Sequence, residues 1–109
     1  MQYNFFVYIL TNYDRKILYT GVINDLERRL TEHYLGIDQK VSFTGKYKCF
    51  YLVWFERHQY VKHAIEREKE IKGWARAKKN RLIEESNPNW EFLNKEVMEW
   101  PPIPENKKS

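Results

Sequence analysis

The stretch Glu66-Arg67-Glu68-Lys69-Glu70-Ile71-Lys72-Gly73-Trp74 decides how the second half of this chain folds. A helix that begins near Gln59 and runs through it has apolar residues at the three- and four-residue spacing of a buried stripe. Glu68 lies on the same stripe, and Gly73 ends the helix. The expected stripe consists of Val61, Ala64, Ile65 and Ile71.

A glutamate on a core-facing stripe is costly unless its charge is paired or binds a metal ion. Three interpretations of Glu68 follow. It lies half-exposed at the edge of the stripe, it belongs to a structural ion pair, or it is a functional carboxylate. The rest of the chain decides between them through the partners that it supplies.

The chain of 109 residues has the length of one small domain. We predict a folded unit over residues 1–96 and a flexible Pro- and Lys-containing tail over residues 97–109. No apolar run approaches the roughly 20 residues of a membrane span, and no secretory signal is visible. The single Cys49 excludes an internal disulfide and a cysteine-based zinc site, which favours a cytoplasmic setting.

Apolar runs rich in β-branched and aromatic residues predict three strands, and the first is apolar on both faces, as in a central strand. Helical patterns follow the second and third strands. The expected fold is therefore α+β, a small three-stranded antiparallel sheet flanked by helices in the order β-β-α-β-α-α. The strands are expected at residues 4–11, 17–22 and 49–56, and the helices at 25–34, about 59–72 and 74–86.

Two tyrosines are expected to point the same way from neighbouring strands. Tyr8 shares a face with Phe6 and Leu10 in the first strand, and Tyr19 shares a face with Gly21 in the second. Gly21 is expected to let another backbone or a ligand come close. If the register permits, Tyr8 and Tyr19 form one site next to Gly21.

The first helix brings a basic pair to the border of its buried face. Arg29 and His33 lie one turn apart, beside an apolar ridge that contains Leu26 and Leu30. Isolated Arg and His residues on helices are usually surface groups. Such a pair just after a glycine-containing strand is better suited to binding an anion.

Positive charge is concentrated in one segment. The net charge of the chain is +4, whereas the segment from Arg67 to Arg81 has seven Lys or Arg against two Glu, a net charge of +5. A concentrated basic face suits a polyanion, although many charge runs are merely solvated. The residues expected to bind nucleic acid are Lys46, Lys72, Arg76 and Lys79.

Several linked motifs, in this order and spacing, resemble the GIY-YIG nuclease superfamily and in particular its small stand-alone bacterial members. They are Val-Tyr-Ile-Leu-Thr-Asn from Val7, Leu-Tyr-Thr-Gly-Val-Ile-Asn-Asp-Leu-Glu-Arg-Arg-Leu-Thr-Glu-His from Leu18, Ala-Ile-Glu-Arg-Glu-Lys-Glu-Ile-Lys-Gly-Trp from Ala64, and Asn-Pro-Asn-Trp from Asn87. Phe-Val-Tyr stands for the name-giving Gly-Ile-Tyr and Tyr-Thr-Gly for Tyr-Ile-Gly. Both tyrosines and the second glycine are kept.

The resemblance implies hydrolysis of DNA phosphodiester bonds with one divalent metal ion, Mg²⁺ or Mn²⁺. By position, Glu68 matches the metal-binding carboxylate and Arg29 the arginine that holds the scissile phosphate. Tyr8 matches the general base or nucleophile-positioning tyrosine, Tyr19 its companion, and His33 a supporting proton-transfer residue. Asn87 matches a polar position that only some relatives have.

Independent chemistry agrees with this implication. Negative charge accumulates in a phosphodiester transition state, so a metal ion and a guanidinium are suitable stabilisers. Mg²⁺ prefers oxygen ligands and keeps several waters, so one glutamate is enough. A free phenol is a poor base at neutral pH, and the sequence leaves open which of Tyr8, Tyr19 and His33 takes the proton.

Two other functions stay open. The same fold serves as a non-catalytic nucleic-acid-binding module, and exposed aromatics such as Trp100 suit a protein-interaction domain. The expected partner is DNA, bound either without specificity or according to its structure.

Overall fold

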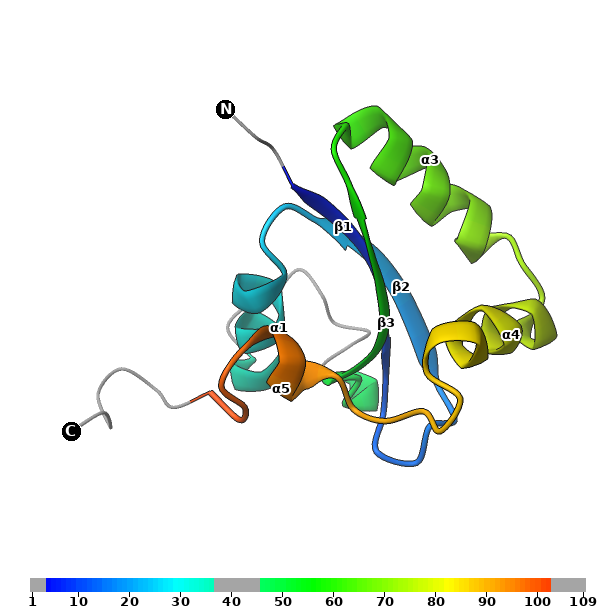
Figure 1. Cartoon of the computed structure of the whole chain (residues 1–109). Coiled ribbons are helices and arrows are strands. Elements are labelled where there is room, and N and C mark those ends of the chain that lie inside the picture. Colours follow the sequence, from blue (N-terminus) through cyan, green and yellow to red (C-terminus); the bar gives the residue numbers. More distant parts are fainter. Residues whose placement is uncertain (1–3, 37–45, 103–109) are drawn as a thin grey trace.

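A computed structural model describes residues 4–36 and 46–102 of the chain. It contains a three-stranded antiparallel sheet between two layers of helices (Figure 1), which confirms the predicted α+β fold. The predicted element order is also found, with one short helix added near the C-terminal end. The elements are β1 Phe5–Thr11, β2 Leu18–Ile23, α1 Leu26–Leu35, β3 Tyr51–His58, α3 Val61–Lys72, α4 Arg76–Ser86 and α5 Asn94–Val97.

The first strand lies at the centre of the sheet, in the order β2-β1-β3. Val7, Ile9 and Leu10 in β1 are fully buried, because helices cover both faces. In the antiparallel pairing, Tyr8 lies opposite Gly21 and Leu10 opposite Tyr19. The two tyrosines are therefore diagonal neighbours on one face, as the two-residue period predicts.

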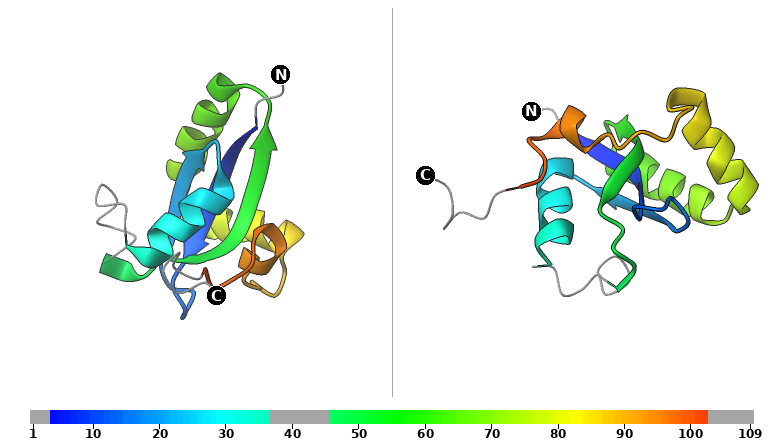
Figure 2. Two further views of the ribbon diagram at one scale, coloured as in Figure 1. Left: turned by 90° about the vertical axis from the view of Figure 1, so that its left-hand side faces the viewer. Right: turned by 90° about the horizontal axis from the view of Figure 1, so that it is seen from below.

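Each face of the sheet has its own hydrophobic core. Val7 and Ile9 pack with residues of α3 and α4, whereas Tyr8 and Leu10 pack with residues of α1. Figures 1 and 2 show α1 and α5 on one side of the sheet and α3 and α4 on the other. Consecutive side chains of β1 therefore belong to opposite layers.

The ends of α1 have the expected local chemistry. Asp25 is the N-cap, and its Oδ1 accepts a hydrogen bond from the backbone N–H of Arg28 at 3.0 Å. Gly36 ends the helix in the left-handed conformation at φ 68°, which glycine adopts without a side-chain clash. These two ends fix the part of the chain that positions Arg29 and His33.

The expected stripe on α3 is wrong at two of its four positions. Ala64 and Ile71 are fully buried, but Val61 is 48% and Ile65 is 40% exposed. A helix turns by about 100° per residue, and α3 contacts the sheet through the face that carries Ala64 and Ile71. Val61 and Ile65 therefore lie to one side of this contact face. A three-stranded sheet is too narrow to cover that side as well.

The segment after α4 returns to the sheet. Trp90 and Phe92 pack against one core cluster, and Val97, Met98 and Trp100 pack against the other. The Trp100 ring meets the Tyr34 ring edge-on, with 4.9 Å between centroids. The boundary at residue 96 stays a prediction, with packing beyond it as far as Trp100. Residues 103–109 of the predicted tail lie outside the described residues.

Within residues 4–36 and 46–102, no helix combines the length and the apolar character that crossing a membrane requires.

Candidate active site

The side chain of Tyr8 crosses the neighbouring strand directly above Gly21. A Cβ atom built on Gly21 would lie 2.5 Å from Tyr8 Cζ and closer still to the hydroxyl oxygen. No side chain larger than hydrogen fits there while Tyr8 keeps this position. Close approach at Gly21 was expected from another backbone or a ligand, and the group found there is the Tyr8 side chain.

Burial is the main reason why the Tyr8 hydroxyl stays protonated. Tyr8 is 1% exposed, and Arg29 Nε donates a long hydrogen bond of 3.4 Å to its hydroxyl oxygen. Burial, the largest effect, raises the pKa of Tyr8 to about 12. The Arg29 hydrogen bond and charge lower this pKa, whereas Tyr19 and the Glu68 charge raise it. Tyr8 is thus a neutral phenol at physiological pH.

Tyr19 and His33 continue the site from Tyr8 towards α1. The Tyr8 and Tyr19 ring centroids are 6.4 Å apart, and the Tyr19 and His33 centroids are 6.1 Å apart. His33 is 3% exposed, and Arg29 Nη1 lies 3.8 Å from Glu32 Oε1. Four of the predicted site residues therefore lie together between β1, β2 and α1. They are Tyr8, Tyr19, Arg29 and His33.

Glu68 comes from the opposite helical layer, on α3. Its side chain is 15% exposed, and its Oε2 is 3.3 Å from Lys72 Nζ one turn later. α3 lies mainly over β1 and β2, and the Glu68 charge contributes to raising the pKa of Tyr8. The Glu68 charge is therefore close enough to act electrostatically on the Tyr8 hydroxyl, although Tyr8 packs with α1 and Glu68 comes from α3.

The chemistry around Glu68 fits a magnesium-like ion with a single protein carboxylate. Within the described part of the chain, no three His, Cys, Asp or Glu side chains are grouped as metal ligands. A hard divalent ion that keeps most of its waters needs only one such oxygen donor. Glu68 supplies that donor, provided that Lys72, which is 49% exposed at its side chain, turns away to water.

Asn87 does not lie with these residues, because its side-chain amide organises a turn at β3. Its Nδ2 donates to the carbonyls of Val53 at 3.0 Å and Glu91 at 2.9 Å, and its Oδ1 accepts from the Glu91 N–H. Asn94, which no sequence pattern indicated, accepts a hydrogen bond from the Leu52 N–H at 2.8 Å through its Oδ1 and donates one to the Phe50 carbonyl at 2.9 Å through its Nδ2. Both asparagines satisfy backbone groups of β3 on the side where none of the described strands pairs with it.

The predicted nucleic-acid-binding residues have different surroundings. Arg76 uses all three guanidinium nitrogens, donating to Asn80 Oδ1 and to the carbonyls of Lys16 and Arg15. Arg76 thus fastens the β1–β2 turn to α4, and we leave it out of the proposed phosphate contacts. Lys79 is half-buried on α4, and Lys46 is exposed above the Tyr47 ring at 5.4 Å.

Comparison with known proteins identifies the family and the fold. Residues 4–81 match the family model described as the GIY-YIG catalytic domain. A UPF0213 protein of Natronomonas pharaonis is 40% identical over 78 residues, which cover 72% of this chain and 88% of that protein. A UPF0213 protein of Staphylococcus aureus is 39% identical over 80 residues, 73% of this chain and 94% of the relative. The solution structure of a UPF0213 protein of Bacillus halodurans has a TM-score of 0.53 and 30% identity, and the match covers 84% of this chain and 95% of that one.

Proposed function

The chain belongs to the GIY-YIG family, a family of nuclease type, and from this premise we propose that it is a metal-dependent endonuclease that hydrolyses DNA phosphodiester bonds. One observation carries the proposal. The Tyr8 phenol lies over Gly21 with Arg29 at its hydroxyl and Glu68 within electrostatic reach. A purely structural core has no need for a buried phenol between an arginine and a carboxylate.

In the proposed reaction, Arg29 donates hydrogen bonds to a non-bridging oxygen of the scissile phosphate and stabilises its growing charge. Tyr8, as a neutral phenol, orients the attacking water and does not itself remove the proton. Proton transfer is assigned to the neighbouring Tyr19 and His33, because histidine is the side chain that ordinarily titrates near neutral pH. Glu68 would hold Mg²⁺ or Mn²⁺, which would supply Lewis-acid stabilisation of the phosphate.

Substrate binding is assigned to exposed and half-buried lysines around the site. Lys46 and Lys79 contact phosphates, and Lys72 joins them once a metal ion takes its place at Glu68. Such contacts give salt-dependent affinity without sequence preference. The DNA partner and the cytoplasmic setting are parts of this proposal.

The test is nicking of supercoiled plasmid by the purified chain with Mg²⁺, with Mn²⁺ and with chelator. Arg29→Gln is expected to lower the rate by roughly 10²–10³-fold, the cost of removing one positioned charge donor. The matched control is Arg28→Gln, one residue along α1, whose side chain is 54% exposed and is expected to matter little. Chelator-insensitive nicking, or equal rates for both variants, would reject the proposed enzyme. Binding without any nicking would instead identify a non-catalytic nucleic-acid module.

The raised pKa of Tyr8 has a consequence for alkaline stability. A phenol with a folded-state pKa of about 12 and an ordinary value near 10 stabilises the fold fully below pH 10 and loses this contribution as the pH rises to 12. Tyr8→Phe should lack this loss, which is on the order of 2–3 kcal/mol for a shift of this size.

The measurement is the free energy of unfolding in urea for wild type and Tyr8→Phe, at about pH 9 and about pH 11, where roughly half of this loss, about 1.4 kcal/mol, is expected. Other tyrosines and lysines titrate in both proteins, so only the difference between the two reports Tyr8. Parallel pH dependence in wild type and variant would show that Tyr8 is not held as a buried neutral phenol.

A further inference from the structure

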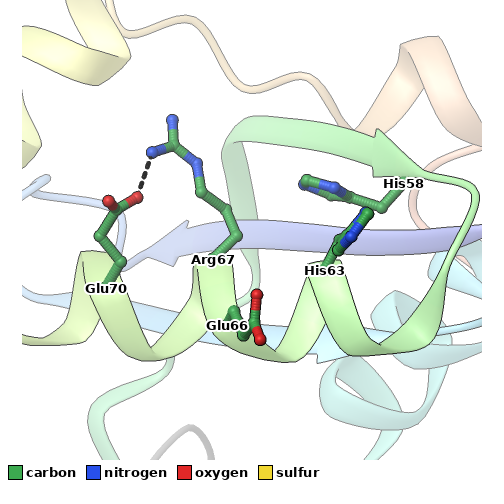
Figure 3. A pocket seen from close by; sticks show the side chains of 5 residues that line it. All are labelled: His58, His63, Glu66, Arg67 and Glu70. Atoms are coloured by element: carbon green, nitrogen blue, oxygen red, sulfur yellow. Dashed lines mark hydrogen bonds and ion pairs between the residues drawn. The ribbon is translucent and has the colours of Figure 1, made fainter.

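The two flanks of α3 differ in character. On the flank that faces β3, Arg67 bridges Glu56 at 3.1 Å and Glu70 at 2.5 Å, and His58 Nε2 lies 2.7 Å from Glu56 Oε1. Figure 3 shows this flank as a polar hollow, lined by His58, His63, Glu66, Arg67 and Glu70. Arg67, the arginine of this flank, is paired with two carboxylates, so this flank offers no strong site for a phosphate.

The other flank of α3 turns towards β2 and holds Glu68. Helical spacing places Val61, Ile65, Glu68 and Lys72 in one row, which we term the β2-facing ridge. Val61 and Ile65 are 48% and 40% exposed, although Ala64 and Ile71 on the same helix are fully buried. An apolar pair thus leads along the surface to the carboxylate assigned to the metal ion.

We propose that Val61 and Ile65 bind the sugar and base next to the scissile phosphate, so that the site prefers DNA whose bases are unstacked beside the cut. This inference rests on the proposed nuclease function, since Glu68 defines where the scissile phosphate lies. Flaps, bulges and single-stranded junctions are the substrate class, and intact duplex is the poorer substrate.

The chemistry of the ridge favours this occupant over a regular duplex. Aliphatic side chains gain nothing from phosphates, and in B-form DNA the base faces are stacked away from a protein surface. Apolar residues contact base faces when they enter an opened step or when the bases are already apart. A duplex must first be unstacked, at a cost that a flap or a bulge avoids.

The position of the ridge distinguishes it from ordinary exposed apolar residues, which need no explanation when they are scattered. Val61 and Ile65 lie seven and three residues before Glu68 in one row, and Lys72 follows Glu68 by one turn. Val61 and Ile65 suit contact with bases, and Lys72 at the other end of the row suits contact with a phosphate. Bases and phosphates also follow one another along a nucleic acid strand.

The experiment compares cleavage of an intact duplex with cleavage of a flapped duplex of the same length, by wild type and by Ile65→Ser. Wild type should favour the flap. Ile65→Ser should lower the flap-to-duplex rate ratio by about tenfold, as expected for loss of a partly buried aliphatic side chain that contacts unstacked bases. The control is Tyr60→Ser, an exposed residue at the start of α3, which should leave the flap preference intact.

Affinities for the same two DNAs, measured by fluorescence anisotropy in chelator, separate the two proposals. Ile65→Lys should bind duplex more tightly yet lose the preference for the flap. An unchanged flap-to-duplex affinity ratio in Ile65→Ser and Ile65→Lys would overturn the ridge inference whether or not the protein cleaves. If the two variants change the flap-to-duplex affinity ratio but the protein shows no metal-dependent cleavage, the proposed enzyme is rejected and the β2-facing ridge is kept as a binding surface.

Discussion

Gly21→Ala is expected to abolish cleavage, because the added methyl group occupies the place of the Tyr8 phenol. The new Cβ would lie 2.5 Å from Tyr8 Cζ, well inside van der Waals contact, and Tyr8 is held in a buried position. Overpacking of this kind costs typically 1–3 kcal/mol of stability, or else the ring moves away from Arg29. Either outcome removes the arrangement on which the proposed chemistry depends.

The measurements are the plasmid nicking rate and the thermal melt of Gly21→Ala, and Gly73→Ala is the control. Gly73 ends α3 at φ −81°, and a Cβ there would meet nothing closer than a backbone oxygen at 3.5 Å. That substitution should leave nicking unchanged. It should raise the free energy of unfolding by about 0.4–1 kcal/mol, because alanine lowers the conformational entropy of the unfolded chain. Wild-type nicking by Gly21→Ala would refute the placement of Tyr8 over Gly21 as a condition for catalysis.

The sequence predicts the sheet better than the layers because strand alternation is a local property. Apolar residues on both faces of β1 indicate a central strand, and the two-residue period places Tyr8 and Tyr19 on one face. Nothing local indicates that α1 and α3 cover opposite faces. That depends on how the chain crosses between β2, β3 and α3, which only the whole fold determines.

For the site residues, too, local pattern predicts some features and tertiary structure determines others. Motif spacing identifies Tyr8, Tyr19, Arg29, His33 and Glu68 as candidates, and the fold brings the first four together. Helical spacing also allows the i,i+4 pair between Glu68 and Lys72, although Lys72 was expected to bind DNA. Arg76 was assigned to DNA by charge alone, whereas its contacts with the Arg15 and Lys16 carbonyls depend on tertiary structure.

Glu68→Gln is expected to abolish nicking while leaving DNA binding and the metal-free fold nearly unchanged. The substitution keeps the shape of the side chain and removes the negative charge that a divalent ion requires. The partner left behind is Lys72, which is 49% exposed and remains hydrated without Glu68. Because Lys72 reaches water, breaking this pair leaves no buried cation without a partner, and the fold should lose little stability.

The alternative interpretation of Glu68 as a structural charge predicts a different pattern. A glutamate that compensates a fully buried cation would cost roughly 3–5 kcal/mol to neutralise, because its partner would be left unpaired. The half-exposed Lys72 does not meet that description. A strongly destabilised Glu68→Gln that still nicks DNA would remove Glu68 from the proposed site.

Thermal melts with Mg²⁺, with Mn²⁺ and with chelator complete the test. Metal should stabilise wild type by about 2.7 kcal/mol at a hundredfold excess over its dissociation constant, and Glu68→Gln by much less. The control is Glu66→Gln, an exposed carboxylate on the β3-facing flank of the same helix. It should keep both the metal-induced stabilisation and the nicking rate, because its charge lies on the opposite side of α3 from the β2-facing ridge. Equal metal effects in all three proteins would show that the ion binds elsewhere, and the role of Glu68 would then have to be sought in positioning Tyr8.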